Sequence, residues 1–153
     1  MDLILWRHAE AHPLREGQSD LERRLTAQGE RQARRMAVWL EQRLPASTLV
    51  LVSPALRCQQ TAKALGRKFR TVEAIAPDAG PAAVLAAARW PESSEPVLVV
   101  GHQPTLGLVA SLLLAGTPQP WSVKKGAVWW LRSRDREGGA PVVLHAVLGP
   151  DGL

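Results

Sequence analysis

Short apolar runs alternate along this chain with segments that have helical spacing. Four of the runs predict strands, placed at residues 2–6, 48–52, 71–75 and 97–100. The segments between them carry apolar positions at helical spacing or helix-start signals, and they predict helices at 26–44, from Ser53 onward, at 82–90 and at 104–114. Two late apolar runs, 127–131 and 142–148, flank a polar loop at 133–140 and predict a hairpin or a pair of edge strands.

This alternation predicts an α/β fold, with a mostly parallel central sheet and helices on both faces. The helix expected at 26–44 has an apolar stripe and ends before Pro45; the stripe consists of Ala33, Met36, Ala37, Leu40 and Leu44. The next helix is predicted to open with Ser53 as its N-cap and Pro54 at its first position. That start makes Arg57 the fourth residue of the helix.

The composition is that of an ordinary globular protein. With 153 residues, 46% of them hydrophobic and 22% charged, the chain suits one domain spanning residues 1–153. No apolar run approaches the ~20 residues of a membrane span, and Asp2 and Arg7-His8 interrupt any secretory signal. The single cysteine, Cys58, excludes an internal disulfide framework. We therefore expect a cytoplasmic protein with no membrane partner.

A net charge of +5 raises the question of nucleic-acid binding. The excess is concentrated in one stretch without acidic residues, which holds Arg57, Lys63, Arg67, Lys68 and Arg70. The chain has one phenylalanine and no tyrosine, so a base-stacking surface would have to come from tryptophan. We expect no nucleic-acid partner, because a solvated helix face and attraction of an acidic or phosphorylated protein explain the charge.

Charged side chains follow three of the predicted strands. Arg7 and His8 follow the first strand, Arg57 lies just beyond the second, and His102 lies just beyond the run 97–100. In open α/β sheets, ligands bind beyond the carboxyl ends of the strands, so we expect these side chains to converge there. Guanidinium groups bind phosphoryl oxygens, and an imidazole can attack phosphorus. The sequence therefore predicts a site for a phosphoryl group.

A histidine nucleophile accounts for more of these residues than metal binding does. Neutral His8 would attack phosphorus and form a phosphohistidine, which water then hydrolyses. The side chains that would balance charge on the phosphoryl oxygens are Arg7, Arg57 and His102. An acid must also protonate the leaving group. The candidates are Glu10, which is the first choice, and Asp20, Glu73 and Asp78.

A metal site is the alternative for the histidines. His8 and His12 are four residues apart, a spacing that binds metal on a helix, but they follow a strand and precede Pro13. No cysteine or carboxylate cluster completes a zinc ligand set. We therefore predict neither a metal nor another cofactor.

Four sequence pieces together point to a known family. They are LWRHAEA at 5–11, RLTAQG at 24–29, VSPALRCQQTA at 52–62 and VVGHQP at 99–104. In content and order they resemble the histidine phosphatase superfamily, and the short chain is most similar to its SixA-like phosphohistidine phosphatase branch. One departure is Ala9, where the commonest superfamily motif has glycine; alanine occurs there among the small members.

The resemblance implies a role for each matched residue. His8 would be the phosphorylated nucleophile, and no metal would be required. The phosphate pocket would consist of Arg7, Arg57 and His102. Further substrate-binding contacts would come from Arg23 or Arg24 and from Gln103. Larger members carry a lid with a catalytic glutamate, but here the stretch between Thr71 and Glu95 is too short for a sizeable lid.

An open site favours a bulky substrate, because closure over a small metabolite excludes water and adds selectivity. We therefore expect a metal-independent phosphatase that acts on phosphohistidine in a signalling or phosphotransfer protein, such as a phosphotransfer domain, and releases inorganic phosphate. One alternative is a small-molecule phosphomonoesterase with the same mechanism. The other, from a different class, is a non-catalytic phosphate-binding module.

Overall fold

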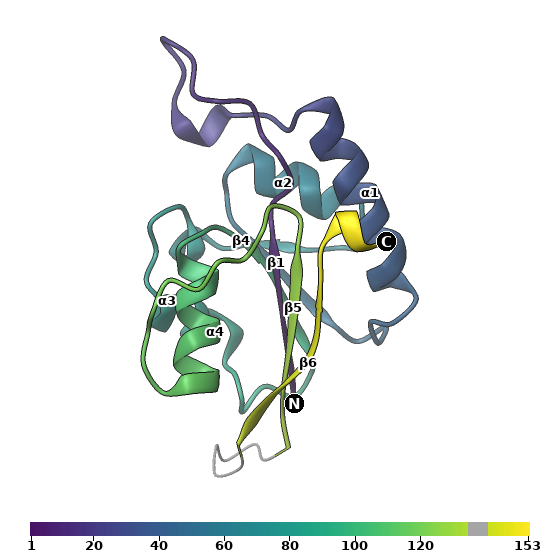
Figure 1. The fold of residues 1–153 in the computed structure, drawn as a ribbon, viewed down its shortest axis with the longest axis vertical. Helices are drawn as coiled ribbons and strands as arrows, with labels where there is room; N and C mark the ends of the chain where they lie inside the picture. Colours follow the sequence, from purple (N-terminus) through teal and green to yellow (C-terminus); the bar gives the residue numbers. More distant parts are fainter. Residues whose placement is uncertain (135–140) are drawn as a thin grey trace.

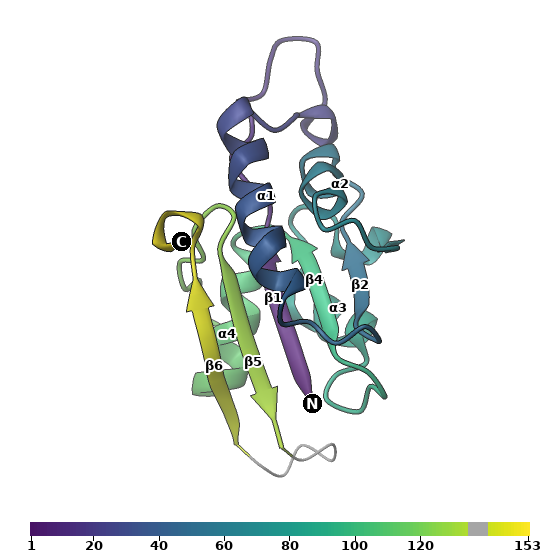
Figure 2. The same cartoon turned by 90° about the vertical axis from the view of Figure 1, so that its right-hand side faces the viewer.

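The structure, a computed structural model, describes residues 1–134 and 141–153. Six strands form one sheet: β1 (Asp2–Arg7), β2 (Leu49–Val52), β3 (Arg70–Thr71), β4 (Val97–Gly101), β5 (Val128–Ser133) and β6 (Val142–Leu148). Their order is β3-β2-β4-β1-β5-β6, and Figure 2 shows β2, β4, β1, β5 and β6 side by side in this order. The first four strands are parallel, whereas β5 runs antiparallel to β1 and β6 antiparallel to β5. The predicted α/β class with a mostly parallel sheet is confirmed.

Helices cover both faces of the sheet, as predicted. They are α1 (Ala27–Glu41), α2 (Leu56–Lys63), α3 (Pro81–Ala88) and α4 (Thr105–Ala115). In Figure 1, α1 and α2 lie on one side of the strands, and α3 and α4 lie on the other. Strand β1 is buried on both faces: Ile4 and Trp6 pack toward α1 and α2, and Leu3 and Leu5 pack toward α3 and α4. A strand buried in this way is uniformly apolar, which explains the run after Asp2.

The first helix begins where expected and ends early. The Thr26 hydroxyl accepts a hydrogen bond from the Gly29 backbone N–H, which caps the N-terminus. The helix ends at Glu41, three residues before the predicted end at Leu44, and Leu44 is still buried. The apolar stripe predicted for this helix faces the core, so the periodicity identified the buried face correctly although the boundary was wrong.

The start predicted for the second helix is wrong. Helix α2 begins at Leu56 with Ala55 as its N-cap, so Arg57 is its second residue and not its fourth. Ser53 does not cap it, because its hydroxyl is hydrogen-bonded to His102 and accepts from the Ala55 backbone N–H. The Ser53 hydroxyl is thus used in a tertiary hydrogen bond with His102 and not in capping the helix.

Two other predictions need correction or lie outside the described residues. The strand predicted at 71–75 is confined to β3, which pairs only with Leu51 and Val52, and a 3₁₀ turn, η2 (Glu73–Ile75), follows it. The late hairpin is confirmed by the β5–β6 pairing. Of the loop predicted at 133–140, Ser133 belongs to β5, and residues 135–140 lie outside the described residues.

The topology gathers several chain segments at one edge of the sheet. Strands β1, β2 and β4 all end there, and β5 starts there because it runs in the opposite direction. A 3₁₀ turn, η1 (Asp20–Glu22), lies at the same end of the molecule, against α2. Between β3 and β4 the chain forms only η2 and α3, which leaves no lid insertion. A third 3₁₀ turn, η3 (Pro150–Gly152), ends the chain.

Candidate active site

His8 lies directly after β1, and two backbone hydrogen bonds hold it in place. Its N–H donates to the Gly101 carbonyl at 3.1 Å, and its carbonyl accepts from the Gly126 N–H at 3.0 Å. The ring Nδ1 lies 2.8 Å from the Ala9 carbonyl, which can only accept, so Nδ1 carries the proton and Nε2 carries the lone pair. Burial, together with the charge of His102, Arg57 and Arg7, lowers the pKa of His8 to about 3. The imidazole is therefore a neutral nucleophile at physiological pH.

Arg57 is a buried cation fixed by the η1 turn. Its Nη1 donates to the Asp20 carbonyl at 2.8 Å, and its Nη2 donates to Asp20 Oδ2 at 3.0 Å. Asp20 also pairs with Arg23 at 3.1 Å. Burial raises the pKa of Asp20, but the hydrogen bonds and charges of Arg23 and Arg57 outweigh it and leave the pKa below its usual range. Asp20 is therefore a carboxylate that orients two arginines.

His102 follows Gly101 at the end of β4 and lies beside His8, with the ring centroids 5.4 Å apart. Its Nδ1 lies 3.4 Å from the Arg57 guanidinium, which can only donate, so Nδ1 accepts. Its Nε2 then donates to the Ser53 hydroxyl at 2.7 Å. Burial and the charge of Arg57 lower the pKa of His102 to about 4. The free site thus holds two neutral histidines.

Cys58 packs under this pair and takes no part as a nucleophile. Its Sγ lies 3.5 Å from His102 Nε2, and the side chain is fully buried. Burial raises the pKa of the thiol to about 12. Because the thiolate is the reactive form, Cys58 is a structural residue here.

Arg7 contributes a second guanidinium. Its Nη1 donates to the Val123 carbonyl at 2.9 Å, and no carboxylate among the described residues pairs with it. Burial and the charge of Arg57 lower the pKa of Arg7. The Nε atoms of both arginines are buried and find no acceptor in the described part of the chain. Two cations close together, each with an unmatched donor, make a site that an anion would stabilise.

One cavity of about 280 Å³ is lined by Arg7, His8, Asp20, Arg57 and His102. Six of the predicted site residues come together there: Arg7, His8, Arg23, Arg57, His102 and Gln103. Gln103 uses both ends of its amide on backbone, donating to the Trp121 carbonyl at 2.7 Å and accepting from the Gly107 N–H at 2.8 Å. Its role in the structure is therefore to hold the segment that leads into β5 against α4.

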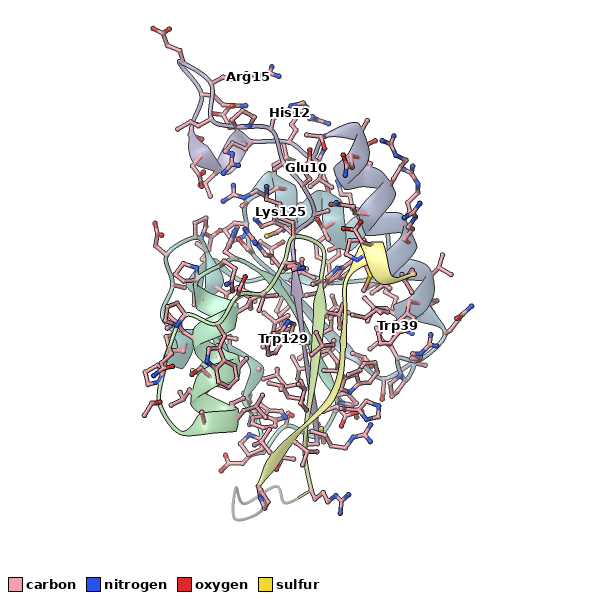
Figure 3. All side chains as sticks on the ribbon, viewed as in Figure 1. Glu10, His12, Arg15, Trp39, Lys125 and Trp129 are labelled. Atoms are coloured by element: carbon pink, nitrogen blue, oxygen red, sulfur yellow. The ribbon has the colours of Figure 1, made fainter. Side chains whose placement is uncertain are left out.

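Two of the predicted site residues lie elsewhere. The Glu10 carboxylate accepts from the Thr26 hydroxyl at 3.2 Å, and Glu10 is not among the residues that line the cavity. Arg24 lines a separate hollow with His12 and Arg15. In Figure 3, Glu10, His12 and Arg15 lie on the segment that leads away from the end of β1, and Arg15 is at its far end.

Of the three other candidates for the acid that protonates the leaving group, two line the cavity and one does not. Asp20 and Asp78 line the cavity, whereas Glu73 does not. Asp78 is exposed, with φ at 69° in the left-handed region, and it has no ion pair among the described residues. Within residues 1–134 and 141–153, only Asp78 therefore offers the cavity a carboxyl group that is not already bound to arginine.

Sequence reasoning missed Lys125, which lines the cavity from the turn before β5. Figure 3 shows it above the end of β1. Its signal was the pair Lys124-Lys125 directly before Gly126 and an apolar run. Since that run is an antiparallel strand, its beginning, and not its end, faces the site.

No three His, Cys, Asp or Glu side chains cluster as potential metal ligands in residues 1–134 and 141–153. Nor does any described helix have the length and apolar character needed to cross a membrane.

Comparison with known proteins identifies the family. The model of the histidine phosphatase superfamily (branch 1) matches residues 3–80, which include Arg7, His8 and Arg57. The chain belongs to this superfamily. A relative from Picosynechococcus sp., an uncharacterized protein, is 33% identical over 95% of this chain and 90% of its own length.

Solved structures of SixA proteins are similar along the whole chain. The protein histidine phosphatase SixA in complex with tungstate has a TM-score of 0.83 and 27% identity, over 99% of this chain and 98% of that one. The putative phosphohistidine phosphatase SixA from Nakamurella multipartitia has a TM-score of 0.78 and 30% identity, over 97% and 95%. The SixA-like resemblance is confirmed, and together with the family match it supports phosphatase activity through a histidine-based mechanism.

Proposed function

We propose that this protein is a metal-independent phosphohistidine phosphatase, in which His8 receives the phosphoryl group of a histidine-phosphorylated protein and passes it to water. The observation that carries the proposal is the state of His8. Its Nδ1 donates to the Ala9 carbonyl, its pKa is lowered to about 3, and it lies in a cavity with the buried guanidinium of Arg57 and the half-buried one of Arg7. A neutral Nε2 facing fixed cations is suited to attack on a phosphoryl group.

The chemistry proceeds in two transfers. In the first, the lone pair of His8 Nε2 forms a bond to phosphorus while the bond from phosphorus to the substrate nitrogen breaks, and the departing imidazole keeps that electron pair. In the second, a water oxygen bonds to phosphorus while the His8–phosphorus bond breaks. The electron pair of that bond returns to Nε2, and the proton that the water loses passes to solvent. Throughout, Arg7 and Arg57 balance the charge on the phosphoryl oxygens without a metal ion.

His102 is placed to change protonation state when the phosphoryl group enters. In the free site its Nδ1 accepts from Arg57 and its Nε2 donates to Ser53. A dianionic phosphoryl group favours the imidazolium, which would donate from Nδ1 to a phosphoryl oxygen while its Nε2 continues to donate to Ser53. A positive His102 would then supply the third charge that the transfer needs.

The carboxylates favour phosphohistidine over a phosphate ester. Asp20 is bound by Arg23 and Arg57, and Asp78 is exposed at the mouth of the cavity, so neither is a buried acid. An alkoxide leaving group needs an acid to protonate it, and of the carboxyl groups that line the cavity only the exposed Asp78 could do so. A phosphorylated imidazole that is protonated on its other nitrogen leaves as a neutral molecule without such an acid. Because η2 and α3 are the only elements between β3 and β4, no lid in that stretch restricts access, which leaves room for a phosphotransfer protein as the substrate. The SixA relative was solved in complex with tungstate, a tetrahedral oxyanion like phosphate, which supports a phosphoryl site without distinguishing the two substrate classes.

A small-molecule phosphomonoesterase with the same mechanism is the second candidate. It is favoured by Asp78, which could protonate an alcohol leaving group from the mouth of the cavity. A phosphoserine phosphatase from Entamoeba histolytica shares this fold, with a TM-score of 0.70 at 15% identity.

The test is phosphate release from a histidine-phosphorylated carrier protein, with a chelator present and an alkyl phosphate measured in parallel. We expect rapid release from the carrier by the unmodified protein and none by His8→Ala. His12→Ala is the matched control, since His12 lies outside the cavity. Release from the alkyl phosphate alone would move the substrate to metabolites. Phosphate binding without release from either substrate would favour a binding module.

A further inference from the structure

A second hollow adjoins the catalytic cavity. Its volume is about 700 Å³, against about 280 Å³ for the catalytic cavity, and Arg7 and Lys125 line both. Farther along it is lined by Lys124, Trp129 and Val147, among others, and we call it the lysine groove. A phosphoryl group needs only the smaller cavity. The groove is therefore available to the rest of a substrate.

The turn that carries the two groove lysines is bonded to the end of β1 by four hydrogen bonds, one of which joins the Arg7 backbone N–H to the Ala127 carbonyl at 3.0 Å. Arg7 Nη1 donates to the Val123 carbonyl at 2.9 Å, the Gly126 N–H donates to the His8 carbonyl at 3.0 Å, and Trp6 Nε1 donates to the Gly126 carbonyl at 3.1 Å. Gly126 itself has φ at 74°, which a side chain would strain. The backbone of this turn is thus fixed relative to His8, although the lysine side chains are exposed.

The groove combines positive charge with apolar surface. Its cations are Arg7, Lys124 and Lys125, and Asp151 is its one lining carboxylate among the described residues. Trp129 and Val147 face each other across β5 and β6, and Val147 is 47% exposed. An acidic side chain next to apolar ones would match this surface.

We propose that the lysine groove binds the polypeptide around the phosphorylated histidine of a protein substrate. Acidic side chains of that polypeptide pair with Lys124 and Lys125, and apolar side chains cover Trp129 and Val147. A small phosphorylated metabolite with one further anionic group could pair that group with Lys125 at the catalytic cavity, without using the rest of the groove. The apolar wall beyond Lys125 matches a peptide chain. This inference rests on the proposed phosphohistidine phosphatase function.

The experiment compares selectivity in charge variants. Selectivity is the kcat/KM for a histidine-phosphorylated carrier protein divided by that for p-nitrophenyl phosphate. Lys124→Glu and Val147→Glu each place a negative charge in the groove but outside the catalytic cavity. Lys68→Glu is the matched control, because Lys68 is exposed and lines neither hollow. We expect each groove variant to lower selectivity about fivefold at low salt, mainly through KM, and the control to leave it unchanged.

Binding of the phosphorylated carrier to His8→Ala, with and without Lys124→Glu, separates this inference from the proposed function. Carrier hydrolysis with unchanged selectivity in both groove variants would overturn the groove and leave the phosphatase function standing. No carrier hydrolysis, but carrier binding weakened by Lys124→Glu, would overturn the function and support the groove. Neither hydrolysis nor binding of the carrier would overturn both, and groove-dependent hydrolysis of small anionic phosphates alone would assign the groove to metabolites instead.

Discussion

Acidification from pH 7 to pH 5 should lower the free energy of unfolding by about 4 kcal/mol through His8 and His102. Their pKa values fall from 6.5 to about 3 and about 4 in the folded protein. The stabilisation from keeping them neutral is therefore complete above pH 6.5, and it is lost progressively as the pH falls toward 4 and 3. Each pH unit inside that window is worth about 1.4 kcal/mol per group, so pH 5 costs about 2 kcal/mol at each histidine.

A loss of this size is a large part of the stability of a typical domain, which is about 5–15 kcal/mol. Urea unfolding followed by tryptophan fluorescence at pH 7, 6 and 5 measures it. A His102→Asn variant has lost one of the two titrating groups and should show about half the pH dependence. A wild-type decrease below about 1 kcal/mol, or the same decrease in wild type and variant, would refute the reasoning from burial.

Three further predictions concern single residues. Asp20→Asn removes the carboxylate that orients Arg57 and should lower kcat/KM about tenfold with little change in circular dichroism; unchanged kinetics would contradict that role. Asp78→Asn should lower alkyl phosphate hydrolysis about a hundredfold but phosphohistidine hydrolysis much less, and equal losses would show that both leaving groups need this acid. Gly107→Ala places a Cβ 1.8 Å from the Trp121 carbonyl oxygen and should lower the free energy of unfolding, measured by thermal unfolding, by about 1–3 kcal/mol. Gly80→Ala is the control, because an added Cβ there meets nothing within 4 Å, and equal effects of the two substitutions would contradict the clash.

The sequence was most informative where one property decides the structure. The run after Asp2 is uniformly apolar because β1 is buried on both faces, and the 3.6-residue spacing from Ala33 to Leu40 marks the buried side of α1. Both features depend on burial, which a sequence pattern records directly. The carboxyl ends of the parallel strands could therefore be located, and with them Arg7, His8 and His102.

Prediction of side-chain roles from the sequence failed where a residue far away in the sequence forms the hydrogen bond that the local pattern assigned elsewhere. Ser53 has the sequence of an N-cap, but its hydroxyl is bonded to His102, 49 positions away. Likewise, Glu10 is close to His8 in sequence but turns to Thr26, while Asp20 reaches Arg57 from a turn of its own. No pattern along the chain encodes such pairings. Lys125 was missed because the antiparallel direction of β5 becomes known only with the topology.

The position of β1 between β4 and β5 has a consequence for the order in which the protein becomes active during synthesis. The backbone partners of His8 are Gly101 and Gly126, and Arg7 bonds Val123, 116 positions later. A nascent chain that ends before Val123 lacks two of these three partners, Val123 and Gly126, and cannot hold Arg7 and the imidazole in place. The candidate site is therefore complete only after the turn before β5 has been synthesised and bonded to the end of β1.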